Sequence, residues 1–459
     1  MSNCCRPEVG EMLPVVSPRR SEQSHTSAAP TLAPAGPSKV GDLVFLRRLT
    51  AIDAVKKLVA GKERARDRFW QQKERENSAL VAAYVRVMTD YRHDEPVQEE
   101  AMMAITQIIS GGHGFDAFLA SGGIDAVVAA MCEHRQAHMQ QQGCSTLCQV
   151  ADGDTAFKLA VIDAKGAEAV VSGLQAHMRD YYVAERACSA LRSLAAGDSE
   201  CKQRIVSVGG VEVIISAMRA YPKRPVVVER GAAALCCVAQ GTDACREQIV
   251  SAGGVTAVMT AMKEHAGQMQ VQTHGCALVK HLAAGQPPWS GALVAEGVVT
   301  RVTASMRRYP KQPMVHLLAC GALAALAEGD DQLKWSVVRG GGLVAACTSL
   351  QLHVARAAVS ERGLAVLCNL AQGGRELKSE IARAHGVECI ARAMKELSGN
   401  VGVQTQACAA LANIASGGED CKEAIVRMNV ARYTVLAMKS HPSTAAMQEL
   451  GCCCLANIG

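Results

Sequence analysis

A repeat of about 44 residues constrains the fold of this chain more than any other feature. The glycine that starts each copy recurs at steps of 43, 44, 44, 43, 45 and 44 residues. A period of this length is typical of a solenoid, in which each unit packs only on its neighbours. The length of 459 residues therefore does not predict the number of separate domains, because a repeat array can grow without adding domains. The glycines are Gly123, Gly166, Gly210, Gly254, Gly297, Gly342 and Gly386.

One copy contains the three helices that we expect in every copy. A short helix over Cys245–Ser251 ends at a Gly-Gly pair, where a left-handed cap forms easily. A second helix is expected over Val255–Glu264, and a break follows it. A third helix over Val271–Ala284 has an inward stripe of apolar residues at helical spacing, which includes Cys276 and Leu282.

The composition favours closely packed helices over sheets. Hydrophobic residues make up 49% of the chain but aromatic residues only 3%, so small aliphatic residues and cysteine must build the core. Many of the 20 cysteines recur at intervals of 44 residues and lie within apolar helical stripes. This pattern predicts reduced, buried thiols. We expect a cytoplasmic chain, with a nuclear or membrane-peripheral location left open. The sequence has no secretory signal and no long apolar run, so we expect no transmembrane segment.

The sequence divides into three parts. Residues 1–40 are rich in proline and lack a helical period, which predicts a disordered tail. Cys4 and Cys5 in this tail are either acylated or unmodified, and Ser2 excludes N-myristoylation. Residues 41–78 are expected to form N-terminal capping helices. Residues 79–459 are expected to hold eight full repeats and a partial ninth.

No residue pattern indicates catalysis, a cofactor or a metal. Histidine recurs at the turn after the second helix, as at His265, but tyrosine replaces it in other copies, as at Tyr309. Metal ligation is therefore not what this position requires, and we expect the ring to cover the joint between helices. The glycine-rich segments follow no strand, so they lack the context of a phosphate-binding loop. We expect a protein that is not an enzyme.

The repeat resembles the armadillo repeat. The motif I-V-x-x-G-G-V occurs at Ile205–Val211 and Ile249–Val255, and V-Q-x-x-x-C-x-x-L-x-N-I-A occurs at Val403–Ala415. The resemblance covers about residues 67–459. It implies an all-α, right-handed superhelical solenoid of armadillo-type three-helix repeats. In many members of the family, the third helices line a concave groove in which asparagines and tryptophans hold an extended peptide.

This chain keeps only part of that groove pattern. The family's asparagine position is occupied by Asn only in the last three copies, and small residues replace every tryptophan. We therefore do not expect the basic-peptide binding of nuclear-import receptors. Basic or imidazole side chains are expected to add positive charge near the middle of the groove. The candidate groove residues are Gln107, Gln149, Arg192, Ser193, Lys280, His281, His316, Asn369, Asn413 and Asn457.

Two functions fit these patterns. The first is a non-enzymatic scaffold whose groove binds a helical or an acidic extended segment of a partner protein. The alternative is an assembly or cytoskeletal module that associates through the last repeat, for which we expect no polar cap and hence self-association or a larger complex. The net charge of +5 is only mildly basic, so no nucleic-acid partner is expected.

Overall fold

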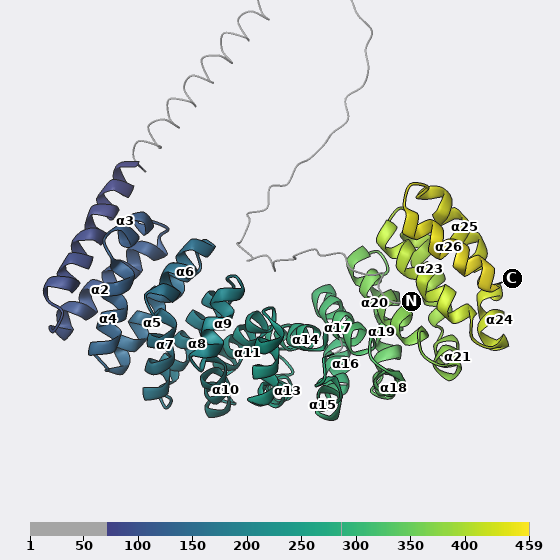
Figure 1. The fold of residues 1–459 in the computed structure, drawn as a ribbon, viewed down its shortest axis with the longest axis horizontal. Helices are drawn as coiled ribbons and strands as arrows, with labels where there is room; N and C mark the ends of the chain where they lie inside the picture. The colour runs from purple at the N-terminus through teal and green to yellow at the C-terminus, as the bar shows by residue number, and fades with distance from the viewer. Residues whose placement is uncertain (1–70, 286, 459) are drawn as a thin grey trace, which may run out of the picture. The chain divides into compact units, whose positions relative to one another are not determined.

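The computed structural model describes residues 71–285 and 287–458, and every regular element in these ranges is helical (Figure 1). The predicted tail and the capping segment up to residue 70 lie outside the described residues. Residues 71–459 form one compact unit of successive three-helix repeats. The prediction of an all-α solenoid is thus confirmed.

The array begins with two helices and continues with eight three-helix units. The first two helices cover residues 71–90 and α2 (Glu95–Ser110). Each later unit begins with a short helix. These short first helices are α3 (Phe115–Ala120), α6 (Thr155–Asp163), α9 (Ser199–Ser207), α12 (Asp243–Ser251), α15 (Ser290–Ala295), α18 (Asp331–Arg339), α21 (Arg375–Arg383) and α24 (Glu419–Arg427).

The second and third helices follow in the same order in every unit. The second helices are α4 (Gly123–Glu133), α7 (Gly166–Ala176), α10 (Gly210–Ala220), α13 (Gly254–Glu264), α16 (Val298–Arg308), α19 (Gly342–Leu352), α22 (Gly386–Glu396) and α25 (Val430–Ser440). The third helices are α5 (Ala137–Ala151), α8 (Tyr181–Ala195), α11 (Pro225–Ala239), α14 (Met269–Ala283), α17 (Pro313–Leu326), α20 (Ala357–Ala371), α23 (Val401–Ala415) and α26 (Ala445–Ile458).

These bounds agree with the sequence-based helices to within two residues in the unit formed by α12, α13 and α14. The position of the incomplete unit and the boundary at residue 78 differ from the sequence-based expectation of eight full repeats followed by a partial ninth. The incomplete unit among the described residues is the first one, and the last unit has all three helices. The helix over residues 71–90 also crosses the expected boundary at residue 78 without a break.

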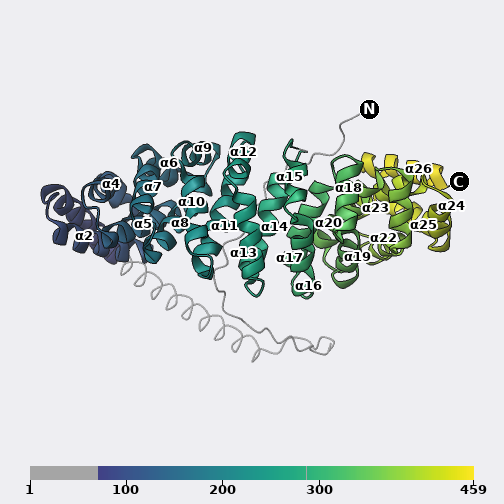
Figure 2. The same cartoon turned by 90° about the horizontal axis from the view of Figure 1, so that it is seen from below.

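Each third helix packs against the third helices of the neighbouring units, so the units follow one another in chain order (Figures 1 and 2). Small residues allow this close approach. Cys144 and Cys276 are fully buried, as is Leu282. The prediction that the recurring cysteines are small core residues is confirmed for these positions, and the described cysteines are free thiols.

The second helix of every unit starts after a residue in the left-handed region. Gly253 before α13 has φ 77°, as the Gly-Gly pair predicts. Glycine adopts this conformation without the clash that a Cβ atom causes. In three units a residue other than glycine adopts this conformation: Lys165, His385 and Asn429 have φ 61°, 59° and 53°.

In several units the turn after the second helix forms a hydrogen bond to the preceding unit. The Nε2 of His265 donates a hydrogen bond to the carbonyl oxygen of Pro222, at 2.7 Å. Tyr309 fills the same position one unit later, and its hydroxyl donates to the carbonyl of Ala266 at 3.0 Å. Both rings reach a main-chain carbonyl of the preceding turn, which explains why histidine and tyrosine replace one another there.

A buried glutamine near the start of the third helix pins the end of the second helix. The Nε2 of Gln272 donates to the carbonyls of Met262 and His265, at 2.9 and 3.0 Å. The Met262 carbonyl lies in the last turn of α13, where helix carbonyls lack an N–H partner, so the side chain satisfies a group that burial would otherwise leave unpaired. The His265 carbonyl also accepts the backbone N–H of Gln268 at 2.9 Å. The same pair of bonds is made by Gln98, Gln140, Gln404 and Gln448.

Candidate protein-binding groove

The exposed and half-buried side chains of the third helices form the surface that we call the groove face. The three predicted asparagines occupy equivalent positions on α20, α23 and α26. The Nδ2 of Asn369 donates to the carbonyl of Ala324 at 2.9 Å, and that of Asn457 donates to Ala412 at 2.9 Å. Asn413 reaches the carbonyl of Cys368 at 3.5 Å. Each asparagine therefore bridges its own third helix and the preceding one.

Other polar residues continue this line toward the N-terminal units. Gln107 is exposed on α2, and Gln149 of α5 accepts a hydrogen bond from the Ser110 hydroxyl at 2.7 Å. Ser193 is only 2% exposed and donates to the Asp152 carboxylate at 2.5 Å. It therefore supports the floor of the groove face and offers little surface to a partner.

Burial makes one predicted cationic residue neutral. Lys280 and His281 are half-buried on α14. Burial, together with the charges of Lys280 and Arg246, lowers the pKa of His281 to about 4. The imidazole is therefore uncharged at neutral pH, and the positive charge in this part of the groove face comes from lysine and arginine.

His316 does not belong to the groove face, contrary to the sequence-based expectation. Its side chain is 1% exposed, and it occupies on α17 the position that Gln272 occupies on α14. Its ring packs against that of His353, with the ring centroids 4.5 Å apart. The 44-residue register thus places His316 between the second and third helices, inside the unit.

A polar pocket of about 310 Å³ opens on the groove face across α5, α8 and α11. Three arginines from α8 and α11 line it, and Asp152 is its single acidic residue. The nearest guanidinium nitrogen of Arg192 lies 3.7 Å from the Asp152 carboxylate. The complete lining is Ser145, Cys148, Gln149, Asp152, Arg186, Ser189, Arg192 and Arg230.

Sequence reasoning missed two of these arginines. Arg186 and Arg230 are one period apart, and His274 follows them after another period. The positions that correspond to asparagine and tryptophan in the family do not include this one. A comparison of every position of the third helix across the repeats would have shown that the two arginines occupy equivalent positions in neighbouring repeats.

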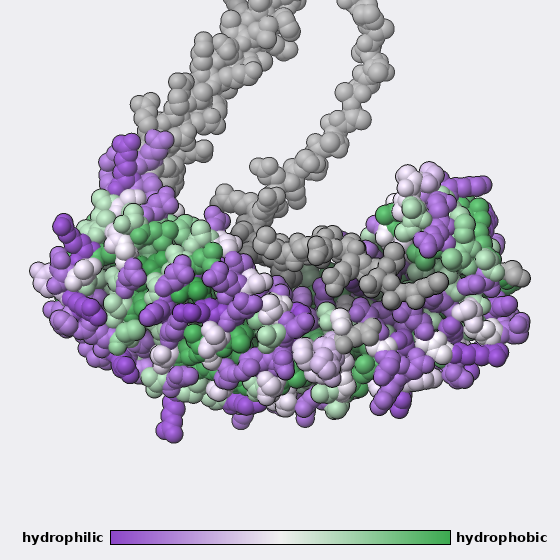
Figure 3. All heavy atoms as spheres, in the orientation of Figure 1, coloured by the Kyte–Doolittle hydropathy of each residue, from purple (hydrophilic) through white to green (hydrophobic). Residues whose placement is uncertain are grey.

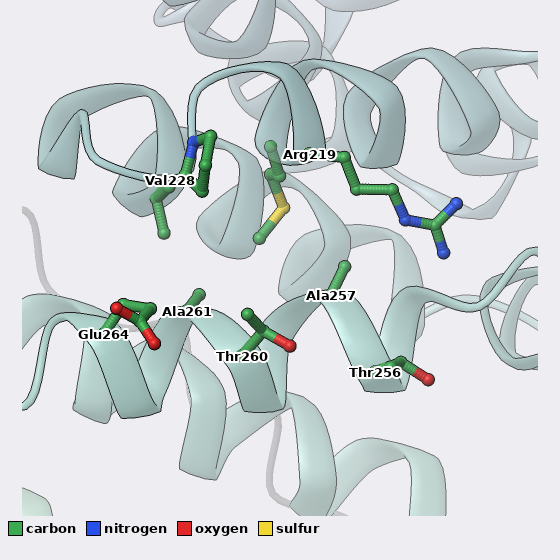
Figure 4. Close-up of a pocket in the computed structure, with 9 residues that line it drawn as sticks. Arg219, Val228, Thr256, Ala257, Thr260, Ala261 and Glu264 are labelled. Atoms are coloured by element: carbon green, nitrogen blue, oxygen red, sulfur yellow. The ribbon is translucent and has the colours of Figure 1, made fainter.

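A smaller hollow of about 190 Å³ lies between the second helices α10 and α13 (Figure 4). Ala257, Thr260 and Ala261 of α13 form one wall. Val228 of α11 points toward this wall in the close-up and takes the place of the pinning glutamine. An equivalent hollow of about 110 Å³ lies between α4 and α7, where Gln140 keeps the pinning position, so the hollow recurs with either residue there.

Groups of metal ligands and membrane-spanning helices are both absent from the residues that the structure describes. Within 71–285 and 287–458, no three His, Cys, Asp or Glu residues gather closely enough to hold a metal ion. In the same ranges, every helix is too short or too polar to cross a membrane.

Comparisons with known proteins agree with this architecture. The family model described as LRRK2 ARM repeat matches residues 292–459. Comparison with curated proteins gave no match. A solved engineered protein from a structural genomics consortium is 28% identical, with a TM-score of 0.75, and the alignment covers 83% of this chain and 88% of that chain.

Computationally designed armadillo repeat proteins for modular peptide recognition are also among the similar solved structures. They are 20% identical to this chain, with a TM-score of 0.48, over 54% of this chain and 98% of theirs. The family match covers the C-terminal units. It agrees with the 44-residue period and with the regular order of short, medium and long helices in the array. The family model thus identifies armadillo repeats in residues 292–459, and the preceding units have the same three-helix fold.

Proposed function

We propose that this chain is a non-enzymatic interaction scaffold that binds a segment of a partner protein along its groove face. The observation that carries the proposal is a set of polar side chains at one equivalent position of the third helices, from Gln149 on α5 to Asn413 on α23. Cys237 on α11 and Ala325 on α17 interrupt this set. These side chains stand on helices whose other faces are buried, so their positions are fixed before a partner arrives. Such preorganisation lowers the entropic cost of binding.

The hydrogen-bonding capacity of the asparagines suits a main chain as the ligand. An asparagine amide has two N–H donors and one carbonyl acceptor. Asn369 uses one donor on the carbonyl of Ala324. No other hydrogen bond of its amide is found among the described residues, so a donor and an acceptor remain for the alternating N–H and C=O groups of an extended segment.

A random-peptide display library, panned against the full chain, tests this function. Asn369→Arg and Asn413→Arg should abolish capture of the selected peptides, because each replaces an amide of the groove face by a long charged chain. Gln332→Arg on α18 is the matched control, since Gln332 is exposed on a first helix. Peptides that bind all three variants equally well would place recognition elsewhere and refute the proposal.

A second candidate function is association through the last unit. Cys452 on α26 is exposed, whereas Cys408, its counterpart one unit earlier, is fully buried. Likewise Val435 on α25 is 38% exposed, and its counterpart Ala391 is 3% exposed. Hydrophobic residues gather over α25 and α26 in Figure 3. Exposed apolar surface of this kind favours association.

Light scattering over a range of concentrations tests this alternative. If the last unit mediates self-association, the average mass should rise with concentration, and Val435→Lys should suppress the rise. Gln332→Arg again serves as control. A mass that stays constant at the monomer value would refute self-association through this face.

A further inference from the structure

The arginine pocket on the groove face has more positive charge than its own residues neutralise. Arg186 on α8 and Arg230 on α11 make no hydrogen bond or ion pair with any residue that the structure describes. Arg192 lies near Asp152 at 3.7 Å, and its Nε is buried without a hydrogen-bond partner. Arg186 is exposed and Arg230 is half-buried, so solvent reaches both, whereas the buried Nε of Arg192 is costly to leave unpaired. The pocket can therefore accept an anion from outside the chain.

The serine hydroxyls of the pocket do not compete for that anion. The hydroxyl of Ser145 donates to the backbone carbonyl of Gln141 at 2.8 Å. The hydroxyl of Ser189 donates to the backbone carbonyl of Glu185 at 2.9 Å. Both hydroxyl protons are thus used within their own helices.

The charged donors in the pocket are the three guanidinium groups, of which Arg192 already donates one N–H to the Ser193 hydroxyl at 3.4 Å. The amide N–H groups of Gln149, whose Oε1 accepts from Ser110, are a neutral donor beside them.

The neighbours of the pocket add no further charge. Burial, with the nearby charges of Arg192 and Arg230, lowers the pKa of His274 to about 4, so this imidazole is neutral at pH 7. Burial raises the pKa of the Cys148 thiol, which therefore stays protonated. Three guanidinium groups against the one carboxylate of Asp152 leave a local charge of about +2.

We infer that this pocket binds the phosphate group of a phosphorylated serine or threonine within the partner segment. The inference rests on the proposed function, because it assigns one contact of the same groove face. A phosphate monoester has a charge of about −1.5 to −2 at pH 7 and three acceptor oxygens, which match the surplus charge and the three forked donors. A carboxylate has half that charge and leaves at least one guanidinium without an acceptor.

The test measures binding of fluorescent peptide pools to the full chain by anisotropy. The pools have randomised flanks and a central phosphoserine, serine or glutamate. The phosphoserine pool should bind at least tenfold more tightly than the serine and glutamate pools, since each charge-assisted hydrogen bond is worth about a factor of ten or more. Inorganic phosphate should compete with the phosphoserine pool.

Substitutions assign the preference to the pocket. Arg186→Gln and Arg230→Gln should each remove it, and Arg186→Lys should retain part of it, because lysine keeps the charge but loses the forked geometry. Arg308→Gln, at an exposed position on α16, is the matched control and should bind like the wild type. Circular dichroism of each variant checks that the helices persist.

The outcomes separate this inference from the proposed function. Equal binding of all three pools, with no effect of the arginine substitutions, would overturn the phosphate pocket and leave the groove function standing. Failure of every pool to bind would contradict the groove function itself. A glutamate pool that matches the phosphoserine pool, or a short single-stranded RNA that binds more tightly than either, would also overturn the inference.

Discussion

His316 and His353 pack edge to face inside the array, with their ring centroids 4.5 Å apart. His316 occupies the position at which Gln272 binds two carbonyls at the end of the second helix. The His316 ring faces the carbonyls of Tyr309 and Met306, but neither ring nitrogen reaches them with the geometry of a full hydrogen bond. The sixth unit, formed by α15, α16 and α17, therefore lacks a stabilising device that other units have.

Restoring that device should stabilise the protein. We expect His316→Gln to raise the free energy of unfolding by about 1–2 kcal/mol, because the amide can bond the carbonyls of Met306 and Tyr309, as Gln272 bonds their counterparts. Urea unfolding followed by circular dichroism measures the change. The reciprocal substitution Gln272→His should cost a similar amount. A loss of stability in His316→Gln would mean that packing against His353 outweighs the missing hydrogen bonds.

The same histidine should make stability depend on pH. Burial, and then the neighbouring His353, lowers the pKa of His316 to about 4 in the folded state, whereas a histidine in an unfolded chain titrates near 6.5. The unfolded state thus takes up the proton first as the pH falls. The stability that the neutral ring provides is complete above pH 6.5 and is lost progressively between about pH 6.5 and 4.

Urea unfolding at pH 7.5, 6 and 5 checks this dependence. The free energy of unfolding should fall over the series, and the fall should be smaller in His316→Gln. His274 and His281 should account for part of the remaining slope, because burial lowers the pKa of each to about 4 as well. Identical slopes in the variant and the wild type would show that His316 does not contribute.

Lys165 identifies a second position at which the array can be stabilised. It precedes α7 with φ 61°, where most units have glycine. A side chain with a Cβ atom costs about 1 kcal/mol or more in this conformation. Lys165→Gly should therefore increase stability by about 1 kcal/mol in thermal or urea unfolding. Lys165→Ala keeps the Cβ atom and should give no such gain, so equal effects of the two substitutions would contradict the explanation.

Much of the fold could be predicted from the sequence, because a solenoid repeats one short structural unit whose helices can be read from a single repeat. The regular 44-residue spacing of the glycines and the apolar stripe of α14 were sufficient to place three helices in a unit. The positions of Lys165 and His385 show the limit of that reasoning. Register alone places them at the left-handed position, but only backbone geometry shows that they adopt it.

The candidate site was less predictable, because the charge of a side chain depends on its burial. His281 was expected to contribute positive charge, yet its environment makes it neutral at pH 7. His316 was assigned to the groove although its register matches the pinning glutamine Gln272. Arg186 and Arg230 were overlooked because a pocket across three helices is not visible in any single repeat.

The link between the fifth and sixth units depends on one tryptophan. Pro287 and Pro288 precede α15, which has only six residues. The Nε1 of Trp289 donates to the carbonyl of Leu282 at 2.9 Å, near the end of α14. The indole thus satisfies a carbonyl of the last helical turn, which has no N–H partner within the helix.

Trp289→Phe separates this hydrogen bond from the packing of the ring. Phenylalanine retains an aromatic ring against the core but has no donor, so we expect a loss of about 1 kcal/mol in the free energy of unfolding. Trp335→Phe is the matched control, because no hydrogen bond of the Trp335 indole occurs among the described residues, and it should cost less. Urea unfolding of both variants measures the difference. If Trp335→Phe proved as costly as Trp289→Phe, ring size rather than the bond to Leu282 would explain the requirement for tryptophan.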